Sequence, residues 1–283
     1  MLSVIIPANN EQALLGACLN SLLASDSTAC TVEIIVVANG CTDRTVEVAR
    51  GYVAQAQARG WKMQVLDLPE GGKMRALNAG DAAARLPWRA YLDADVTVAP
   101  GLLNQLCRAL DGPKAAYASG TLRITAQGWV SRAYAAPYRQ VPFMARGVPG
   151  CGLFAVNAAG RARWDSFPDI ISDDTYVRLL FRPEERIAVP ATYDWPVVEG
   201  FGALVRVRRR QDRGARQVAA LYPELMAHED KPRLGPGGML ALFARNPVGF
   251  AVYSGVALAV RMGDRHRGSA ASGVVMADWS RGR

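Results

Sequence analysis

The sequence is poor in the residues that build disulfide frameworks and zinc centres. Its 283 residues include 5 cysteines and 2 histidines. The cysteines are odd in number and widely spaced, with no C-x-x-C pair, and His228 and His266 lie far apart in the chain. Disulfide-rich domains and zinc sites usually show such residues at short, regular spacings. We therefore expect reduced thiols, no histidine-based metal site, and a cytoplasmic protein.

Long apolar runs are also missing. The first residues, MLSVIIPANNE, show no basic segment followed by a long apolar core, so we expect no secretory signal. The apolar stretch at residues 246–260 is 15 residues long and lies between Arg245 and Arg261. A membrane-spanning helix needs about 18–20 residues. This stretch therefore predicts either a buried helix or a helix that lies in a membrane interface.

The first 199 residues have no excess of positive charge, and the whole excess lies in the rest of the chain. Residues 200–283 contain 14 Arg and Lys against 6 Asp and Glu, whereas residues 1–199 contain 19 of each, so the net charge of +8 belongs to the last 84 residues. Such a basic region suits nucleic acid, anionic lipid or a phosphorylated substrate. RNA-binding surfaces usually interleave aromatic residues with the basic ones. Residues 204–217 contain no aromatic residue, so we expect no nucleic-acid partner.

Strand and helix patterns alternate along the first 95 residues. Short runs rich in branched residues predict buried strands at residues 2–6, 32–40, 63–68 and 88–96, and apolar residues at helical spacing predict helices at 11–25, 43–60 and 73–86. This alternation predicts an α/β fold with a mostly parallel, Rossmann-like sheet flanked by helices. Ligands bind at the carboxyl ends of such strands, where Pro7–Glu11, Asn39–Asp43 and Asp93–Asp95 fall.

The pattern after residue 100 is less regular. We expect a helix at 101–110, a strand at 115–125, helical structure at 127–146 and a Gly-rich turn into a short strand at 147–157. The segment ISDDTYVRLLF predicts a helix with Ser172 as its N-cap and Asp173 and Asp174 in its first turn. A further strand is expected near residues 186–197.

Seven segments in this order resemble the motifs of the family 2 glycosyltransferases, which have the GT-A fold. They are SVIIPANNE, VVANGCTDRT, GGKMRALNAG, YLDADV, GCGLFAVN, ISDDTYVR and RRRQDRG. The resemblance covers residues 2–215 and implies transfer of a sugar, with inversion, from a nucleotide-diphosphate donor. It implies a catalytic domain at residues 1–215, with a nucleotide-binding half at 1–100 and an acceptor-binding half at 101–215. Residues 216–283 would form a basic and apolar, helical C-terminal extension.

The resemblance assigns a metal site to Asp93 and Asp95. A divalent cation, Mn²⁺ or Mg²⁺, held by carboxylates and diphosphate oxygens would neutralise the departing nucleotide. Asp95 matches the direct ligand, and Asp93 matches the residue oriented to the ribose or the metal. Within a strand the two side chains would share one face. The alternative is that both aspartates form an ordinary turn.

Two acids at a helix start match the family's base. Inverting transfer needs a group that takes the proton of the acceptor hydroxyl. By resemblance Asp174 is this base, and Asp173 positions it or binds the acceptor. The alternative is that both acids stabilise the helix N-terminus.

The first turns match the family's nucleotide site. Pro7, Ala8, Asn10 and Glu11 match P-x-x-N-E, whose backbone and glutamate contact the nucleoside. The resemblance also assigns Asn39 to the base edge and Lys73, from the G-K-x-x-A-L-N motif, to the nucleobase or the diphosphate. For Asp43 we favour a structural role, as the cap of the next helix.

Residues of the acceptor side are matched less closely. Gly150 and Gly152 permit close backbone approach to a ligand, and Cys151 between them fits a small packing residue. Processive members carry Q-x-x-R-W, whereas here Arg210 stands in place of Gln, Arg213 matches, and Gly214 replaces Trp. We therefore expect transfer of a single sugar, with Arg210 and Arg213 binding the diphosphate or a phosphorylated acceptor and Arg213 the stronger candidate. The alternative is that these arginines belong to a solvated helix face that touches membrane lipid.

The resulting hypothesis is a hexosyl-transferring enzyme of glycan or polysaccharide synthesis that uses a UDP-sugar. Its acceptor would be a glycan or a lipid-linked molecule, and the protein would be cytoplasmic or peripheral on an anionic membrane. A sugar-nucleotide nucleotidyltransferase is one alternative, but PANNEQALLG is not its Gly-rich loop. A non-catalytic, membrane-associated scaffold is the other, and the intact acid pairs argue against it.

Overall fold

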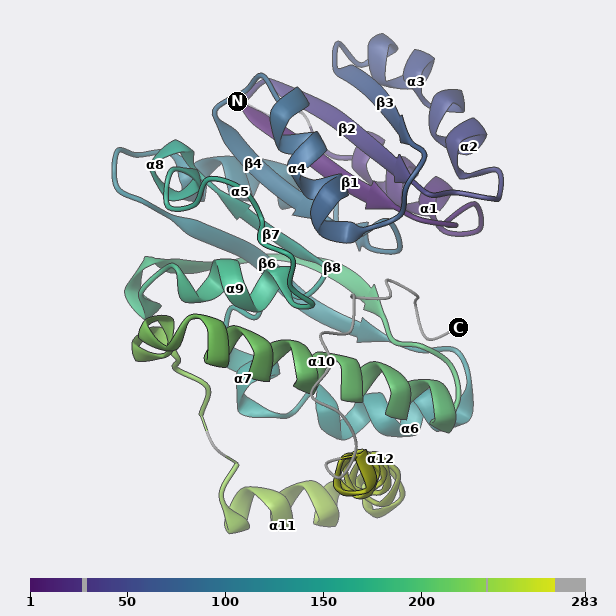
Figure 1. Cartoon of the computed structure of the whole chain (residues 1–283), viewed down its shortest axis with the longest axis vertical. Helices are drawn as coiled ribbons and strands as arrows, with labels where there is room; N and C mark the ends of the chain where they lie inside the picture. Colours follow the sequence, from purple (N-terminus) through teal and green to yellow (C-terminus); the bar gives the residue numbers. More distant parts are fainter. Residues whose placement is uncertain (27–29, 233, 268–283) are drawn as a thin grey trace.

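The computed structural model describes residues 1–26, 30–232 and 234–267 and contains one eight-stranded sheet in the order β3-β2-β1-β4-β7-β6-β8-β5 (Figure 1). The strands are β1 (Leu2–Ala8), β2 (Val32–Asn39), β3 (Lys62–Leu68), β4 (Trp88–Leu92), β5 (Thr97–Val98), β6 (Tyr117–Thr125), β7 (Leu153–Val156) and β8 (Arg186–Pro196).

Helices cover both faces of this sheet and extend beyond it. In the first half they are α1 (Leu15–Leu23), α2 (Thr45–Gly51), α3 (Val53–Ala58), α4 (Lys73–Ala83) and α5 (Leu102–Leu110). In the second half they are α6 (Trp129–Tyr138), α7 (Pro142–Arg146), α8 (Ala158–Arg161), α9 (Asp173–Leu179), α10 (Phe201–Leu221), α11 (Pro236–Arg245) and α12 (Pro247–Arg267), with 3-10 turns η1 (Pro183–Glu185) and η2 (Pro223–His228).

The first half confirms the predicted parallel sheet. Strands β3, β2, β1 and β4 are neighbours and all run parallel. Their side chains alternate between two cores: Val4 and Ile6 pack with α1 and α5, whereas Ile5 packs on the other face with Leu77 of α4. The carboxyl ends of the four strands therefore lie at one edge of the sheet, where the predicted ligand turns follow.

The second half is mixed rather than parallel. Strand β7 lies antiparallel between β4 and β6, β8 runs parallel to β6, and the two-residue strand β5 pairs antiparallel with β8. The antiparallel register of β4 and β7 places Leu92, the last residue of β4, opposite Leu153, the first residue of β7. This pairing brings the Gly-rich turn before β7 to the end of β4.

Three local expectations are corrected. Strand β4 ends at Leu92, so Asp93 and Asp95 lie in a turn, closed by the Val96 N–H donating to the Asp93 carbonyl at 3.1 Å, and not within a strand. The helix expected at 43–60 is interrupted at Tyr52 and forms α2 and α3. The expectation of five free thiols was wrong, because Cys30 and Cys107 form a disulfide.

The disulfide could not be read from spacing. Its two cysteines are 77 residues apart, and only folding brings their Cα atoms to 6.6 Å, within the range that a disulfide spans. Cys30 lies just before β2 and Cys107 lies on α5. Cys18, Cys41 and Cys151 are not disulfide-bonded.

The C-terminal helices pack on the far side of α6 and α10 from the sheet (Figure 1). Tyr253 of α12 contacts the rings of Tyr134 and Tyr138 on α6. The apolar stretch at 246–260 is thus helical, as predicted. Within the described ranges, no helix is long and apolar enough to cross a membrane. Residue 215, the predicted end of the catalytic part, lies inside α10.

Buried ion pairs hold the segment after α10 to the body of the protein. Arg178 on α9 has a side chain that is 1% exposed, and it contacts Glu229 at 2.7 Å and Asp230 at 2.9 Å. Arg186 of β8 contacts the same Asp230 at 2.6 Å. Breaking a buried pair leaves an uncompensated charge, which is strongly destabilising. The segment therefore belongs structurally with α9 and β8.

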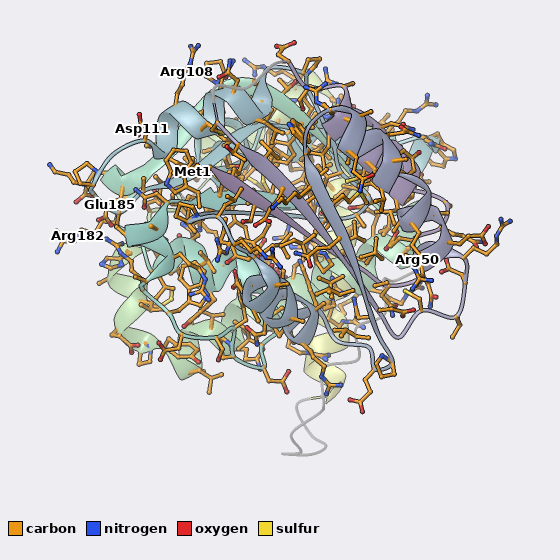
Figure 2. The ribbon with its side chains drawn as sticks, turned by 90° about the horizontal axis from the view of Figure 1, so that it is seen from above. Met1, Arg50, Arg108, Asp111, Arg182 and Glu185 are labelled. Carbon is orange, nitrogen blue, oxygen red and sulfur yellow. A yellow bond between two sulfur atoms is a disulfide. The ribbon has the colours of Figure 1, made fainter. Side chains whose placement is uncertain are left out.

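Other charged side chains, such as Arg108, Asp111, Arg182 and Glu185, lie at the rim of the molecule (Figure 2).

Candidate active site

A cleft opens at the carboxyl edge of the sheet, where β1 and β4 end. Its lining includes Pro7, Lys73, Asp93, Gly150, Cys151, Gly152, Asp173, Asp174 and Arg210. These residues come from six separate parts of the chain, each of which carries one of the motifs singled out above. The structure thus brings together the two acid motifs, the lysine motif and the Gly-rich turn, as the position of strand ends predicts.

Lys73 connects the two acid motifs directly. Its Nζ lies 2.9 Å from Asp93 Oδ1 and 3.0 Å from Asp173 Oδ1. The residue begins α4 after Gly72, whose φ of +147° lets the chain turn sharply into the helix. Burial lowers the pKa of Lys73, but the charges of Asp173 and Asp93 outweigh burial and hold the pKa above its ordinary value. Lys73 is therefore a permanent cation between two carboxylates.

Asp173 is the most buried acid of the cleft. Its side chain is 7% exposed. Burial raises the pKa of Asp173 to about 6, with Asp174 and Asp93 adding repulsion and Lys73 opposing the rise. The carboxylate therefore depends on Lys73 to stay charged near neutral pH.

Asp174 is oriented by its own helix start. Its Oδ1 accepts hydrogen bonds from Ser172 Oγ at 2.6 Å and from the Thr175 N–H at 2.7 Å. Ser172 is the N-cap residue of α9, as predicted, but its hydroxyl donates to Asp174 and accepts from no helix N–H. These bonds fix the rotamer of Asp174 in the cleft. Asp174 therefore contacts the first turn of its helix, and its carboxylate is held in one orientation at the same time.

The Gly-rich turn contacts the end of β4. The Asp93 N–H donates to the Gly152 carbonyl at 2.8 Å, and the Tyr193 hydroxyl donates to the Cys151 carbonyl at 3.0 Å. Gly150 and Gly152 have φ of +68° and +72°, the left-handed region that favours glycine. Burial raises the pKa of the Cys151 thiol well above its ordinary value, which agrees with a packing role.

We expect Gly152→Ala to lower the free energy of unfolding by about 1–3 kcal/mol, because the residue combines a left-handed φ with a crowded site. A Cβ atom there would lie 2.7 Å from Trp195 Cδ1 and 2.8 Å from Val96 Cγ2. Gly60→Ala is the matched control, since Gly60 has φ of +75° but nothing within 4 Å of an added Cβ. Denaturant unfolding of both variants measures the difference. Equal losses would show that crowding at Gly152 contributes nothing.

The turn after β1 is tied to the start of α2. The Glu11 N–H donates to Thr45 Oγ1 at 2.7 Å, and the exposed Asn10, in the left-handed region with φ of 54°, accepts from the Thr42 N–H at 2.8 Å. Asp43 accepts from the Thr45 N–H at 3.0 Å, as a capping side chain would, although the N-cap position of α2 is Arg44 and not the predicted Asp43. Burial raises the pKa of Asp43, but hydrogen bonds from Thr45 and Gln12 outweigh it and lower the pKa overall.

Asn39 is completely buried beside the cleft. Its Nδ2 donates to the Ala8 carbonyl at 2.9 Å, and its Oδ1 accepts from the Gly72 N–H at 3.0 Å. These bonds join the ends of β1 and β2 to the turn that precedes Lys73. The predicted contact between Asn39 and a nucleobase stays a prediction. Asn9, which the sequence reasoning left unassigned, donates to the Asn39 carbonyl at 2.6 Å. Its only signal was its place inside the P-x-x-N-E motif.

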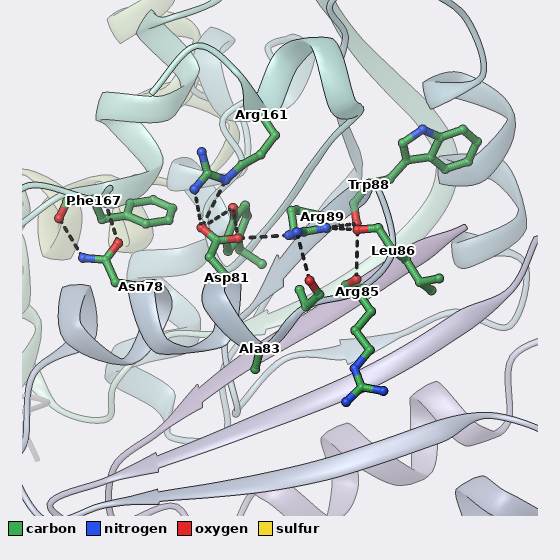
Figure 3. Close-up of polar contacts among 12 residues, drawn as sticks. Asn78, Asp81, Ala83, Arg85, Leu86, Trp88, Arg89, Arg161 and Phe167 are labelled. Atoms are coloured by element: carbon green, nitrogen blue, oxygen red, sulfur yellow. Dashed lines mark hydrogen bonds and ion pairs between the residues drawn. The ribbon is translucent and has the colours of Figure 1, made fainter. Parts of the chain in front are cut away.

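A second buried network supports β4, which leads to Asp93, and α4, which begins at Lys73 (Figure 3). The sequence did not reveal this network. Asp81 of α4 pairs with Arg89 of β4 at 3.1 Å and with Arg161 of α8 at 3.1 Å, and it accepts from the Tyr91 hydroxyl at 2.9 Å. Asn78 of the same helix exchanges hydrogen bonds with the backbone of Phe167 (Figure 3). Helix α4 is thus fixed to β4 and to the chain that leads to α9.

Of the two predicted arginines, the structure brings Arg210 to the cleft and leaves Arg213 exposed outside its lining. Their helix α10 passes close to the acid pair. A Cβ on Gly214 would lie 2.9 Å from Ser172 Cβ, and Gln217 Oε1 accepts from the Ile171 N–H at 2.9 Å. Arg210 thus lies nearer the acid pair than Arg213 does, and the preference for Arg213 as the substrate contact stays a prediction.

The carboxylates of the β4 turn offer oxygen ligands but no complete protein cage. Across residues 1–26, 30–232 and 234–267, no group of three or more His, Cys, Asp or Glu is placed to hold a metal. Asp95 lies in the same turn as Asp93 and is not part of the described cleft lining. Magnesium is commonly held by one or two carboxylates together with substrate phosphates, so Asp93 and Asp95 fit a cation that arrives with a diphosphate.

Comparisons with known proteins identify a family for this chain. The family model "Glycosyl transferase family 2" matches residues 3–163. The chain is 33% identical over 106 residues to the uncharacterized glycosyltransferase EpsJ of Bacillus subtilis (strain 168), a match covering 38% of this chain and 29% of the relative. It is 40% identical over 101 residues to a dolichyl-phosphate beta-glucosyltransferase of Drosophila melanogaster, covering 33% of this chain and 30% of that protein. The matches thus span less than a third of each relative.

Solved structures show the same fold. The mannosyltransferase PcManGT from Pyrobaculum calidifontis, in complex with GDP-Man and Mn2+, aligns with a TM-score of 0.61 at 17% identity, covering 96% of this chain and 76% of that one. S. aureus TarS 1-349 in complex with UDP-GlcNAc aligns with a TM-score of 0.53 at 14% identity, covering 93% and 92%. Because the family model matches more than half of its residues, the chain belongs to glycosyl transferase family 2.

Proposed function

We propose that the protein transfers a single sugar, with inversion, from a UDP-sugar to a glycan or a lipid-linked acceptor. One observation supports this most: Lys73 ties Asp93 to Asp173, so the two acid motifs face one cleft at the carboxyl edge of the sheet. A transferase that separates a diphosphate from a sugar needs positive charge near one acid motif and a proton acceptor near the other.

The proposed reaction uses Asp174 as base. The acceptor hydroxyl oxygen bonds to the anomeric carbon, the bond from that carbon to the diphosphate oxygen breaks, and the hydroxyl proton moves to an Asp174 carboxylate oxygen. The hydrogen bonds from Ser172 and Thr175 hold this carboxylate in one orientation. Asp173 would position Asp174 or bind the acceptor.

Asp95 and Asp93 would hold a divalent cation, Mn²⁺ or Mg²⁺, and Arg210 would contact the diphosphate. When bound, the cation supplies positive charge to the departing diphosphate. Lys73 already pairs with Asp93, so it would lie beside the diphosphate as well. The Mn2+ present with GDP-Man in PcManGT supports a divalent cation that is bound together with the donor. Arg213, exposed on α10, would contribute to the approach of an anionic acceptor.

The nucleoside would lie over the turns after β1 and β2. Pro7 lines the cleft, and Ala8, Asn10 and Glu11 follow it, with Asn39 beneath. Gly150, Cys151 and Gly152 would face the acceptor side. The UDP-GlcNAc and GDP-Man of the two structural neighbours support a nucleotide-sugar donor, and the choice of UDP is our proposal.

We further propose that the catalytic unit continues past the predicted boundary at residue 215 to Asp230. Helix α10 runs without interruption to Leu221, and the ion pairs of Arg178 and Arg186 hold Glu229 and Asp230 in place. The remaining residues would form the extension, and the enzyme would act in the cytoplasm or at a membrane surface facing it.

Calorimetric titration with nucleotide diphosphates and sugar nucleotides, with Mn²⁺ and then with a chelator, tests the proposal. We expect binding of UDP and one UDP-sugar with Mn²⁺ and a loss of at least about tenfold in affinity with chelator. Release of UDP on adding candidate acceptors would then measure transfer. A folded protein that binds no nucleotide would contradict the proposal and favour the non-catalytic scaffold.

A further inference from the structure

Helix α11 exposes an almost wholly apolar surface. Its ten residues, PGGMLALFAR, carry no charge before Arg245, and Leu242 is its only residue that the structure buries. Met239, Leu240 and Phe243 are 40%, 67% and 49% exposed. Surface helices of soluble proteins usually turn polar residues outward. Helix α11 instead turns apolar residues outward, which suggests that its outer side contacts a partner.

Helix α12 also exposes large apolar side chains. Val248, Leu258 and Met262 of α12 are 63%, 57% and 51% exposed, so six of the eleven large hydrophobic side chains exposed in the described residues lie on these two helices. Phe243 and Phe250 are in ring contact at 5.7 Å and join the helices. Both helices lie at the edge of the molecule opposite the first strands (Figure 1). A concentration of this kind usually marks an interaction surface.

The positive charge around this surface favours an anionic partner. From Lys231 to Gly263 the sequence contains Lys231, Arg233, Arg245 and Arg261 but no Asp or Glu. Arg245 and Arg261, both exposed, flank the apolar stretch. A second copy of the chain would bring like charges together on both sides of a shared face, which is unfavourable. An anionic lipid surface instead offers apolar chains below and negative head groups around them.

We propose that α11 and the adjoining face of α12 dock on the surface of an anionic lipid bilayer. Met239, Leu240 and Phe243 enter the interface, and Arg245 and Arg261 contact the head groups. Two arginines of α10 already have partners within the protein: Arg208 pairs with Asp212 at 3.0 Å, and Arg209 donates to the Ala259 carbonyl of α12 at 3.3 Å. The proposal does not depend on the sugar donor or on transfer.

Sedimentation of the full chain with vesicles tests the proposal. One set of vesicles contains equal amounts of phosphatidylcholine and phosphatidylglycerol, and the other contains phosphatidylcholine alone. We expect binding to the first set, reduced at least about tenfold by the double change Leu240→Ser and Phe243→Ser. Changing Arg245 and Arg261 to Gln should weaken binding to the anionic set alone. Leu221→Ser is the matched control, because Leu221 is 56% exposed but lies at the end of α10.

The possible outcomes distinguish a lipid bilayer from a second copy of the chain as the partner of this face. Loss of binding in the α11 variant, with binding kept by Leu221→Ser and the fold checked by circular dichroism, supports the proposal. Wild-type protein that sediments with neither set overturns it, as does an α11 variant that binds as well as the wild type. If light scattering finds a dimer that the α11 changes convert to a monomer, with no vesicle binding, the face belongs to a second copy and the proposal is wrong.

Discussion

Asp174→Asn is expected to lower the rate of sugar transfer by at least about 100-fold while the affinity for the donor nucleotide stays within about twofold of the wild type. An amide cannot take a proton at neutral pH, whereas its shape keeps the acceptor atom for the Ser172 hydroxyl and the Thr175 N–H. A 100-fold loss corresponds to about 2.7 kcal/mol in the activation free energy. Turnover and calorimetric donor binding, measured on the same preparation, test both halves.

Two control variants make this result specific. Asp169→Asn removes an exposed carboxylate from the same part of the chain and should leave turnover unchanged. Ser172→Ala removes one hydrogen bond to Asp174 but keeps its carboxylate, so we expect a loss of less than about tenfold. Full turnover in Asp174→Asn would sink the base assignment. A large loss in Asp173→Asn alone would then move the role to Asp173, whose pKa of about 6 also suits a base.

The ordering of motifs along the sheet was predictable from the sequence because parallel strands end at one edge. Three runs of branched residues and the turns that follow them were enough to place Pro7, Asn39 and Asp93 near one another. The resemblance to family 2 added Lys73 and Asp174, which come from a helix start and from the second half of the sheet. The structure confirms that these residues share a region, and the cleft lining includes four of the five.

The contacts within that region were not predictable, because they depend on tertiary distances. Lys73 was expected to reach a nucleobase or diphosphate, and no sequence pattern indicates that it pairs with both Asp93 and Asp173. Asp81 reads as an ordinary helix residue, yet it is the shared partner of Arg89 and Arg161. Its position on α4 becomes meaningful only once β4 and α8 are seen beside that helix.

Helix packing explains why the two arginines differ in their surroundings. Arg210 and Arg213 are both on α10, and their separation along the chain does not reveal the side on which the helix packs. The close approach of Gly214 to Ser172 and the bond from the Ile171 N–H to Gln217 define that side. Arg210 lines the cleft, and Arg213 is exposed outside its lining. An alignment to a motif carries residue identities, whereas only packing decides which of them lie at a cleft.

The lysine between the acids also indicates how the site stays folded before a donor arrives. Asp93, Asp173 and Asp174 would repel one another in a buried cleft, and the Lys73 ammonium offsets that repulsion. A cation that arrives with a diphosphate changes this balance, because it adds positive charge and the diphosphate adds negative charge. If the donor binds together with a cation, removing the charge of a carboxylate that contacts the cation should weaken donor binding.

Asp95→Asn is accordingly expected to reduce Mn²⁺-dependent donor binding by at least about tenfold and to abolish measurable transfer, because a neutral amide is a much weaker ligand for a hard cation than a carboxylate. The change keeps the size of the side chain in the β4 turn. Asp111→Asn is the matched control: Asp111 lies at the rim of the molecule (Figure 2), is exposed, and follows α5. Titration with UDP in Mn²⁺ and in chelator compares the three proteins. In chelator the wild type and Asp95→Asn should bind UDP equally weakly, since the difference between them is the cation. If Asp95→Asn kept the Mn²⁺-dependent gain in affinity, Asp95 would not be a ligand, and Asp93, which lies in the cleft beside Lys73, would be the next carboxylate to change.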